Sequence, residues 1–138
     1  MDSNRIRTVY EDFASGRLDR VSPLLDEDID FLSHAPQDIF PYLGRRRGRR
    51  EILNALSQVH EKLEVIAFWP ITVVVDDDQA ALTVVVNVRE RATRKSATFL
   101  AAHFLRLRED RIVDYRAIID SFDAVRQLAG ANTSNLRI

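Results

Sequence analysis

Two periodicities divide the chain near residue 63. Before that point apolar residues recur every three or four positions, which predicts three amphipathic helices. Their apolar stripes consist of Ile6, Val9, Tyr10 and Phe13, then Leu18, Val21 and Leu25, and then Ile52, Leu56, Val59 and Leu63. The third helix is predicted to run from Arg49 to Leu63.

From Glu64 onward the period changes to two, which is typical of β-strands. Four long strands are predicted, over residues 65–75, 80–91, 97–108 and 111–119. The breaks between them are short and polar, so neighbouring strands are expected to pair as antiparallel hairpins. Pro70 cannot donate a ladder hydrogen bond, and it must therefore lie at a sheet edge or a bulge.

The remaining segments are shorter. Ile29 to Ser33 predicts a short strand, and the irregular stretch from His34 to Gly44, which contains two prolines, is expected to form the rim of a pocket. Ser121 can cap a last short helix that Gly130 ends. Residues 131–138 are expected to be a flexible C-terminal tail.

Helices followed by a long meander of strands predict the α+β class. Strands of ten or more residues must twist and curl, and a curled sheet with helices on its concave face encloses a cavity. We therefore expect one domain over residues 1–130: a strongly curved antiparallel sheet with three helices on its concave face. β-Branched residues on both faces of the strands leave apolar surface outside, which predicts a homodimer.

Composition narrows the classes of function. The chain has 138 residues and a formal net charge of −1, so the molecule as a whole does not attract nucleic acid. It has no cysteine, which excludes disulfides and thiolate metal sites. No apolar stretch is long enough to cross a membrane, and the N-terminus lacks a signal-peptide pattern, so a cytoplasmic protein is expected. No spacing of His, Asp and Glu suggests a metal site, and no cofactor is expected.

His103 is the first candidate for chemistry. In the strand over residues 97–108 it shares a face with Phe99, Leu105 and Leu107, which is the apolar face, so it is expected to point inward. One interpretation is a core histidine satisfied by a hydrogen bond. The other is an acid, base or polarising group in a pocket, because histidine titrates near neutral pH.

Asp120 and Tyr10 are the other two candidates from pattern alone. Asp120 ends the last strand, where it could be either a cap of the following helix or a general base at a pocket mouth. Tyr10 belongs to the buried stripe of the first helix and could be core or could donate to a ligand oxygen. In the last strand, alternation favours Val113, Tyr115, Ala117 and Ile119 as the buried set.

Five arginines occur in six residues, in the run Arg45 to Arg50. Such a run can bind phosphate or nucleic acid. No aromatic residues are interleaved, however, and the rest of the chain balances the charge. A solvated loop that pairs with acidic neighbours is favoured, and no nucleic-acid partner is expected.

Three stretches resemble the nuclear transport factor 2-like superfamily, and more closely its SnoaL-like and ketosteroid-isomerase-like branch. Pro41 to Ile52 looks like the family's P-x-x-G-x-x-x-G-x-x-x-I pattern at the third helix, Ala102 to Arg108 is similar to its penultimate strand, and Ile112 to Ser121 is similar to its closing strand. The likeness covers residues 6–130. It implies a conical α+β barrel, often homodimeric, with a pocket lined from the final strands.

The resemblance also implies site residues. Asp120 and His103 match positions of an acid–base pair in polyketide cyclases, Arg116 would face the cavity beside Asp120, and Tyr10 lies on the helix that supplies an oxyanion-hole tyrosine in steroid isomerases. This placement reverses the face that alternation assigns to Arg116. The expected ligand-binding residues are Phe13, Trp69, Phe99, Leu105 and Ile118. The last turn, Asp110-Arg111-Ile112, lacks the family's glycine, and no second carboxylate for an isomerase-type site is found.

Three functions follow from these residues. The first is an acid–base enzyme of isomerase, cyclase or hydrolase type that acts on a small apolar carbonyl compound, with Asp120 as base and His103 as its partner. The second is a binding domain with the same pocket and no turnover, and the third is a dimeric scaffold. No membrane partner is expected for any of them.

Overall fold

The computed structural model describes residues 1–128, which form four α-helices, one 3₁₀-helix and six strands. In chain order these are α1 (Ser3–Ala14), α2 (Leu18–Val21), the 3₁₀-helix η1 (Ser22–Leu24), β1 (Leu25–Ser33), β2 (Arg45–Arg47), α3 (Arg49–Lys62), β3 (Leu63–Asp76), β4 (Gln79–Glu90), β5 (Ser96–Arg108), β6 (Arg111–Ile119) and α4 (Ser121–Leu128). The predicted end of the last helix at Gly130 and the predicted tail over 131–138 lie outside the described residues.

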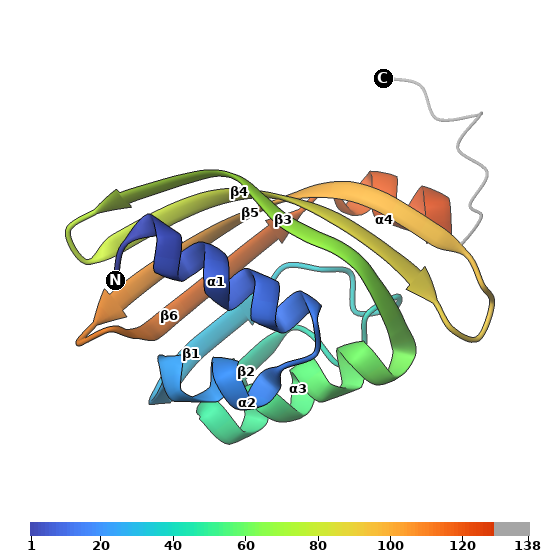
Figure 1. Cartoon of the computed structure of the whole chain (residues 1–138). Coiled ribbons are helices and arrows are strands. Elements are labelled where there is room, and N and C mark those ends of the chain that lie inside the picture. The colour runs from blue at the N-terminus through green and yellow to red at the C-terminus, as the bar shows by residue number, and fades with distance from the viewer. Residues whose placement is uncertain (129–138) are drawn as a thin grey trace.

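The strands form one curved sheet in the order β2-β1-β6-β5-β4-β3. Only β1 and β6 pair in parallel, and all other neighbours are antiparallel. Figure 1 shows α1, α2 and α3 on the concave side of the sheet, with α4 near its far end. The predicted α+β class and the curved, mainly antiparallel sheet are confirmed, but β2 and β3 remain as edges, so the sheet is not closed into a barrel.

Two local features differ from the sequence-based expectation. β1 begins at Leu25 rather than Ile29, and its first residue follows directly after η1. The arginine run was predicted to be a loop, yet Arg45 to Arg47 form β2 and pair with Leu32 to Asp30 of β1. Three arginines carry no alternation of apolar and polar side chains, so a strand that lies at a solvent-exposed edge gives no periodic signal there.

Pro70 and the turn between β5 and β6 lie where the sequence predicts them, at a sheet edge and in a hairpin. Pro70 lies in edge strand β3 beside a register shift, as its missing N–H requires, and its carbonyl accepts a hydrogen bond of 2.9 Å from Arg7 of α1. The β5–β6 hairpin turns at Glu109 and Asp110, which both have positive φ (52° and 59°). Positive φ at both central residues is the backbone of a tight hairpin turn. The turn alone would place His103 opposite Arg116, but a register shift between Arg106 and Leu107 brings Ala117 opposite His103 instead.

The core lies between the concave face of the sheet and the helices. Its largest fully buried side chains are Ile6 of α1, Ile29 of β1, Ile52 of α3 and Val84 of β4. Each comes from a different element, so the core joins both halves of the chain. No helix within residues 1–128 is long and apolar enough to span a bilayer.

Candidate functional site

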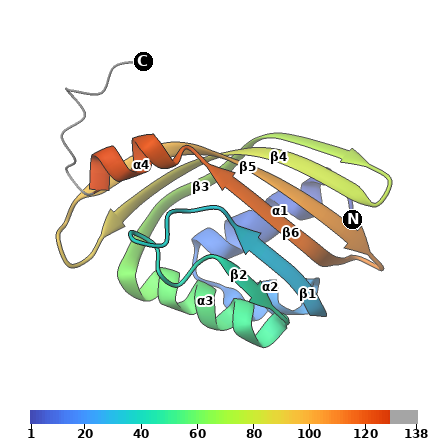
Figure 2. The same ribbon diagram turned by 180° about the vertical axis from the view of Figure 1, so that it is seen from behind.

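A cavity of about 150 Å³ lies inside this core. Its walls come from the apolar stripes of α1, α2 and α3, from the concave faces of β1, β3, β4, β5 and β6, and from the segment that joins β1 to β2. That segment, visible in Figure 2, contributes Ala35, Phe40, Tyr42 and Leu43 to the lining. It is held against the sheet by a hydrogen bond of 2.9 Å from the His34 N–H to the Ala117 carbonyl.

The lining is almost wholly apolar. Of the residues that line the cavity, only five carry a polar side-chain atom, and none carries a formal charge at neutral pH. The five are Tyr10, Ser33, Tyr42, His103 and Tyr115. Because an apolar enclosure cannot solvate an ion, a charged ligand would lose its hydration there without compensation.

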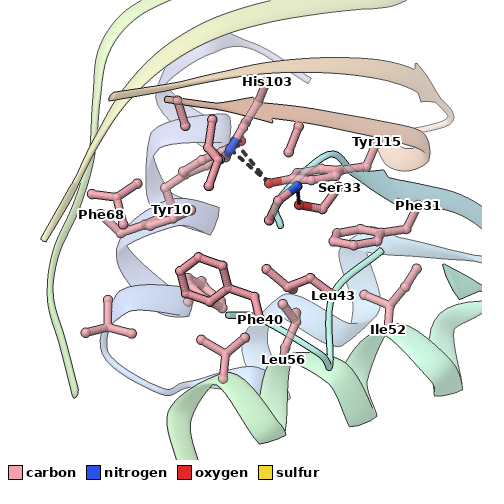
Figure 3. A pocket seen from close by; sticks show the side chains of 18 of the residues that line it. Tyr10, Phe31, Ser33, Phe40, Leu43, Ile52, Leu56, Phe68, His103 and Tyr115 are labelled. Carbon is pink, nitrogen blue, oxygen red and sulfur yellow. Dashed lines mark hydrogen bonds between the residues drawn. The ribbon is translucent and has the colours of Figure 1, made fainter. Parts of the chain in front are cut away.

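Three of these polar residues form one cluster. The Tyr10 Oη lies 2.6 Å from His103 Nδ1, and the Tyr115 Oη lies 3.0 Å from the same nitrogen and 3.2 Å from Nε2. Figure 3 shows the cluster at one end of the cavity, with Phe40, Leu43 and Leu56 at the other. The three side chains come from α1, β5 and β6, so the cluster exists only in the folded chain.

Stacked aromatic rings hold the two phenols in place. The Tyr10 ring stacks on Phe68 of β3 at a centroid distance of 5.4 Å, and the Tyr115 ring stacks on Phe31 of β1 at 4.7 Å, with interplanar angles of 15° and 7°. Offset-stacked aromatic pairs contribute about 0.5–1.5 kcal/mol beyond the area they bury. Each phenol is therefore held by stacking at its ring face and by the contact with His103 at its hydroxyl.

Burial keeps the cluster uncharged. It lowers the pKa of His103 to about 3, because an imidazolium in this cavity would lack solvation. Burial, with a smaller contribution from the neighbouring Tyr115, raises the pKa of Tyr10 well above its usual value, and burial likewise raises the pKa of Tyr115. At neutral pH the cluster thus has two phenols and a neutral imidazole, which can donate and accept hydrogen bonds but resist proton transfer.

Four of the predicted site residues line the cavity and five do not. Those in the lining are Tyr10, Phe13, Phe99 and His103. Leu105 is buried but lies outside the lining. Trp69 and Ile118 are 50% and 52% exposed, so their expected place in the ligand pocket is wrong.

The predicted position of Asp120 in the cavity is also wrong. Its side chain is exposed, and its Oδ1 accepts a hydrogen bond of 3.2 Å from the Asp123 N–H in the first turn of α4. Its own N–H donates to the Leu100 carbonyl at 2.9 Å, which ends the pairing of β6 with β5. Asp120 therefore occupies a helix cap, the first of the two roles that its sequence position allowed.

Arg116 points away from the cavity. Its guanidinium forms ion pairs at 3.1 Å with Asp30 of β1 and with Asp114 of β6, on the outer face of the sheet. Together with Arg106 and Phe104 it borders an open groove of about 480 Å³ on that face. The alternation of residues in the last strand assigned Arg116 to this face correctly, whereas the family resemblance did not.

Tyr115 is the site residue that sequence reasoning did not single out. Alternation did place it in the buried set of the last strand, yet nothing local marks a tyrosine there as different from other core residues. Its partner His103 is twelve positions earlier, and only the β5–β6 register joins them. Within residues 1–128 no group of three or more His, Cys, Asp or Glu side chains could hold a metal ion.

Solved structures share this fold. A candidate isomerase from Rhodopseudomonas palustris is 23% identical, with a TM-score of 0.81 over 91% of this chain and 93% of that one. A protein with a ketosteroid isomerase-like fold from Catenulispora acidiphila, in complex with trimethylamine, is 12% identical, with a TM-score of 0.80 over 99% of this chain and 100% of that one. An LEH-like epoxide hydrolase from M. tuberculosis is 14% identical, with a TM-score of 0.74 over 91% and 86%.

No curated protein matches the sequence. The model of the SnoaL-like domain family does match, over residues 6–115. That span holds most of the described elements and all three residues of the polar cluster. The chain therefore belongs to the SnoaL-like domain family, with the nuclear transport factor 2-like fold.

Proposed function

We propose that this domain binds a small, uncharged and largely apolar compound in the cavity between the helices and the sheet. The observation that carries the proposal is the lining itself, which is apolar except for five neutral polar side chains. A polar group of the ligand, such as a carbonyl, would lie at the end of the cavity formed by Tyr10, His103 and Tyr115.

The volume limits the size of the compound. An apolar cavity of roughly 150 Å³ in another protein stays dry and binds benzene. The cavity of this domain has about the same volume, so a compound with one six-membered ring and a short substituent is the expected size. A larger polycyclic compound would require the segment over residues 34–44 to move outward.

The test uses α-methylstyrene, a one-ring hydrocarbon, and a pair of neighbouring substitutions in β5. Ala101 lines the cavity, whereas Ala102 faces the other side of the sheet. Ala101→Leu should fill part of the cavity and weaken binding at least tenfold, while Ala102→Leu should leave binding unchanged. Titration followed by isothermal calorimetry measures both. Equal binding by the two variants, or no binding by the unaltered protein, would refute the proposal.

Acid–base catalysis is the competing function, and it has less support. Solved relatives are named as an isomerase and an epoxide hydrolase, but those names belong to proteins less than 25% identical to this one. A general base should have a pKa near the working pH. No carboxylate lines this cavity within residues 1–128, and the pKa of His103 is about 3, so its imidazole is a weak base.

Proton exchange separates binding from catalysis. Acetophenone has exchangeable methyl protons next to its carbonyl, and a general base beside it would speed their replacement in D₂O. We expect saturating acetophenone to bind without faster exchange, measured by loss of the methyl signal in proton NMR. Exchange accelerated by the protein and abolished by His103→Phe would instead favour an enzyme.

A small amine is a second ligand to test, because the Catenulispora relative is in complex with trimethylamine. The aromatic rings of this cavity could attract a cation through their faces. No carboxylate in the lining balances the charge, however. Trimethylamine is therefore expected to bind less tightly than α-methylstyrene at pH 7.

We also propose that the domain forms a homodimer through the outer face of the sheet. Large apolar side chains are exposed there on three strands, namely Val74 and Trp69 of β3, Leu100 and Phe104 of β5 and Ile118 of β6. The half-buried Val85 of β4 lies between Trp69 and Leu100. The groove on this face is lined by side chains of both signs, so a two-fold copy can pair Arg106 with Asp114 or Asp76.

A further inference from the structure

One wall of the cavity is tied to the rest of the protein only near its ends. It is the segment from His34 to Gly44, which we call the flap and which belongs to no helix or strand (Figure 2). The Ser33 N–H donates to the Gly44 carbonyl at 3.0 Å, and the His34 N–H donates to the Ala117 carbonyl at 2.9 Å. Within residues 1–128, no backbone–backbone hydrogen bond joins residues 35–41 to any residue outside the flap. The flap can therefore move without breaking a helix or a strand pairing.

The middle of the flap is braced by its own hydrogen bonds. The Pro36 carbonyl accepts from the Phe40 N–H at 2.9 Å, and the Phe40 carbonyl accepts from the Leu43 N–H at 3.1 Å. The rings of Pro36 and Pro41 fix two further backbone angles. Gly44, at the end of the flap, has φ of 100°, which favours glycine. The flap is therefore a stiff unit that ends at a residue with wide backbone freedom.

Apolar burial holds the flap against the cavity. Phe40 and Tyr42 are only 3% and 7% exposed, and both side chains line the cavity. Figure 3 shows Phe40 and Leu43 beside Leu56 of α3, at the end of the cavity that lies opposite the polar cluster. Apolar contacts are not directional, so the flap can leave and return without a specific bond being lost.

One side chain fastens the flap to the sheet. Arg46 of β2 donates to the Tyr42 carbonyl at 3.0 Å, and through its other terminal nitrogen to the Arg45 carbonyl of its own strand at 3.0 Å. The nearby Arg49 makes a similar bond of 2.8 Å, but to the Leu25 carbonyl of β1, which is not part of the flap. Neither Arg46 nor Arg49 lines the cavity. Only the bond from Arg46 therefore holds the flap.

We infer that the flap is the gate of the cavity and that Arg46 is its latch. The ligand enters and leaves at the end formed by Phe40 and Leu43 when the flap swings outward, and Arg46 sets how often that happens. The inference rests on the proposed function for its ligand, but the opening is a property of the chain without ligand. The latch bond does not involve the ligand, so its loss favours opening of the empty and the filled cavity alike. Both rates then rise together, and the dissociation constant does not change while the flap is mostly closed.

The first test compares Arg46→Ala with Arg49→Ala. Calorimetry gives the dissociation constant of α-methylstyrene, exchange NMR gives its dissociation rate, and the two together give the association rate. Loss of a hydrogen bond from a charged group shifts an equilibrium by about tenfold, so Arg46→Ala should raise both rates about tenfold with an unchanged dissociation constant. Arg49→Ala should change neither rate. Unchanged rates in Arg46→Ala, equal acceleration in both variants, or faster dissociation matched by weaker binding would overturn the inference.

Proteolysis measures the opening without any ligand. Chymotrypsin can cut after the buried Tyr42 only when the flap leaves the cavity. When opening is fast relative to cleavage, the rate of cutting follows the open population, so Arg46→Ala should be cut about tenfold faster than the unaltered protein and Arg49→Ala. Mass spectrometry identifies the bond that is cut. Equal cutting after Phe31 of β1 and Phe99 of β5, which are also buried, would show that the chain opens as a whole and that the flap is no gate.

A second pair of variants acts on the end of the flap. A Cβ at Gly44 would collide with the side-chain amide of Gln37, and φ of 100° is unfavourable for alanine. Gly16 also has positive φ, at 76°, but no atom lies within 4 Å of the place of its Cβ. Gly44→Ala should therefore speed the cut after Tyr42, whereas Gly16→Ala should not. The same cutting rate in both variants would count against a moving flap.

Failure of this inference can be told from failure of the proposed function. If α-methylstyrene binds, leaves at the same rate in both arginine variants and Tyr42 is not cut first, the gate is wrong and the proposed function stands. If Tyr42 is cut first, and faster in Arg46→Ala, while the unaltered protein binds no α-methylstyrene, the moving flap stands and the proposed function fails.

Discussion

Tyr10 and His103 are 93 positions apart in the sequence, and their side chains are joined by a hydrogen bond of 2.6 Å inside an apolar cavity. The bond links the first helix to the second-last strand of the sheet. Because both groups are shielded from water, they depend on each other and on the neighbouring Tyr115 to satisfy their hydrogen-bonding capacity. The predictions below begin with the titration of this histidine.

Stability should fall as the pH drops below the ordinary pKa of histidine. Burial lowers the pKa of His103 from 6.5 to about 3, so between these values the unfolded chain binds a proton that the folded chain does not. Stability then rises with pH across this window. A single histidine of this kind should make the free energy of unfolding lower at pH 5 than at pH 7, by on the order of 2 kcal/mol.

Urea denaturation at the two pH values measures this difference. The variant His103→Phe removes the titrating group, so its loss of stability between pH 7 and pH 5 should be smaller by that amount. His60, whose pKa burial also lowers, remains in both proteins and contributes equally. The same pH dependence in His103→Phe as in the unaltered protein would contradict the prediction.

Much of the fold could be predicted because its periodic segments are long. The helix Arg49–Lys62 and the strands β3 to β6 each repeat their pattern over nine residues or more, so tertiary context did not override it. β2 could not be predicted, because its three arginines have no period and pair only with a strand twelve or more positions earlier. A segment whose state depends on a distant partner leaves little local signal.

The candidate site was predicted in part, and the errors in the last strand have one physical origin. Alternation along the last strand assigned Tyr115 to the inside and Arg116 to the outside, which the structure confirms. Applying the family's strand register to this chain reversed the assignment of Arg116 and also placed Asp120 inside the cavity. Shifting a strand by one residue moves every side chain to the opposite face, so a resemblance without an exact register cannot decide which residues face a cavity.

Asp120 should matter for the stability of α4 and not for ligand binding. Its carboxylate caps the helix through the Asp123 N–H. Replacement of a capping Asp by Ala typically costs about 1 kcal/mol, whereas Asn caps about as well as Asp. We therefore expect Asp120→Ala to lower the melting temperature by a few degrees and Asp120→Asn to change it little.

Calorimetric titration with α-methylstyrene supplies the second reading for these variants. Both should bind it as the unaltered protein does, because Asp120 does not line the cavity. Weaker binding by Asp120→Asn, in which the cap is kept and only the charge is lost, would instead place the carboxylate near the ligand.

The arginine run should not bind duplex DNA. Arg45 is paired with Asp30 at 3.0 Å, Arg46 donates to the Tyr42 carbonyl at 3.0 Å, and Arg49 donates to the Leu25 carbonyl at 2.8 Å. The charge of Arg45 is therefore balanced by a carboxylate, and the bonds to backbone carbonyls hold Arg46 and Arg49 against the protein. Fluorescence anisotropy with a labelled duplex should show no micromolar binding at about 50 mM salt, where electrostatic binding would be strongest. Binding that disappears at about 200 mM salt and in Arg47→Ala would show that the run is a nucleic-acid site.

The last prediction concerns the outer face of the sheet, where Leu100 and Phe104 of β5 are 56% and 48% exposed. A charge buried between two copies would cost several kcal/mol without a partner, so Leu100→Glu should convert the expected dimer to a monomer. Phe122 of α4 is equally exposed, at 57%, but lies outside this strand face, and Phe122→Glu is the control that should remain dimeric. Sedimentation equilibrium measures the mass of each. Because the cavity lies on the opposite face of the sheet, the Leu100→Glu monomer should still bind α-methylstyrene. A monomeric unaltered protein at micromolar concentration would reject the dimer and leave the proposal for the cavity unaffected.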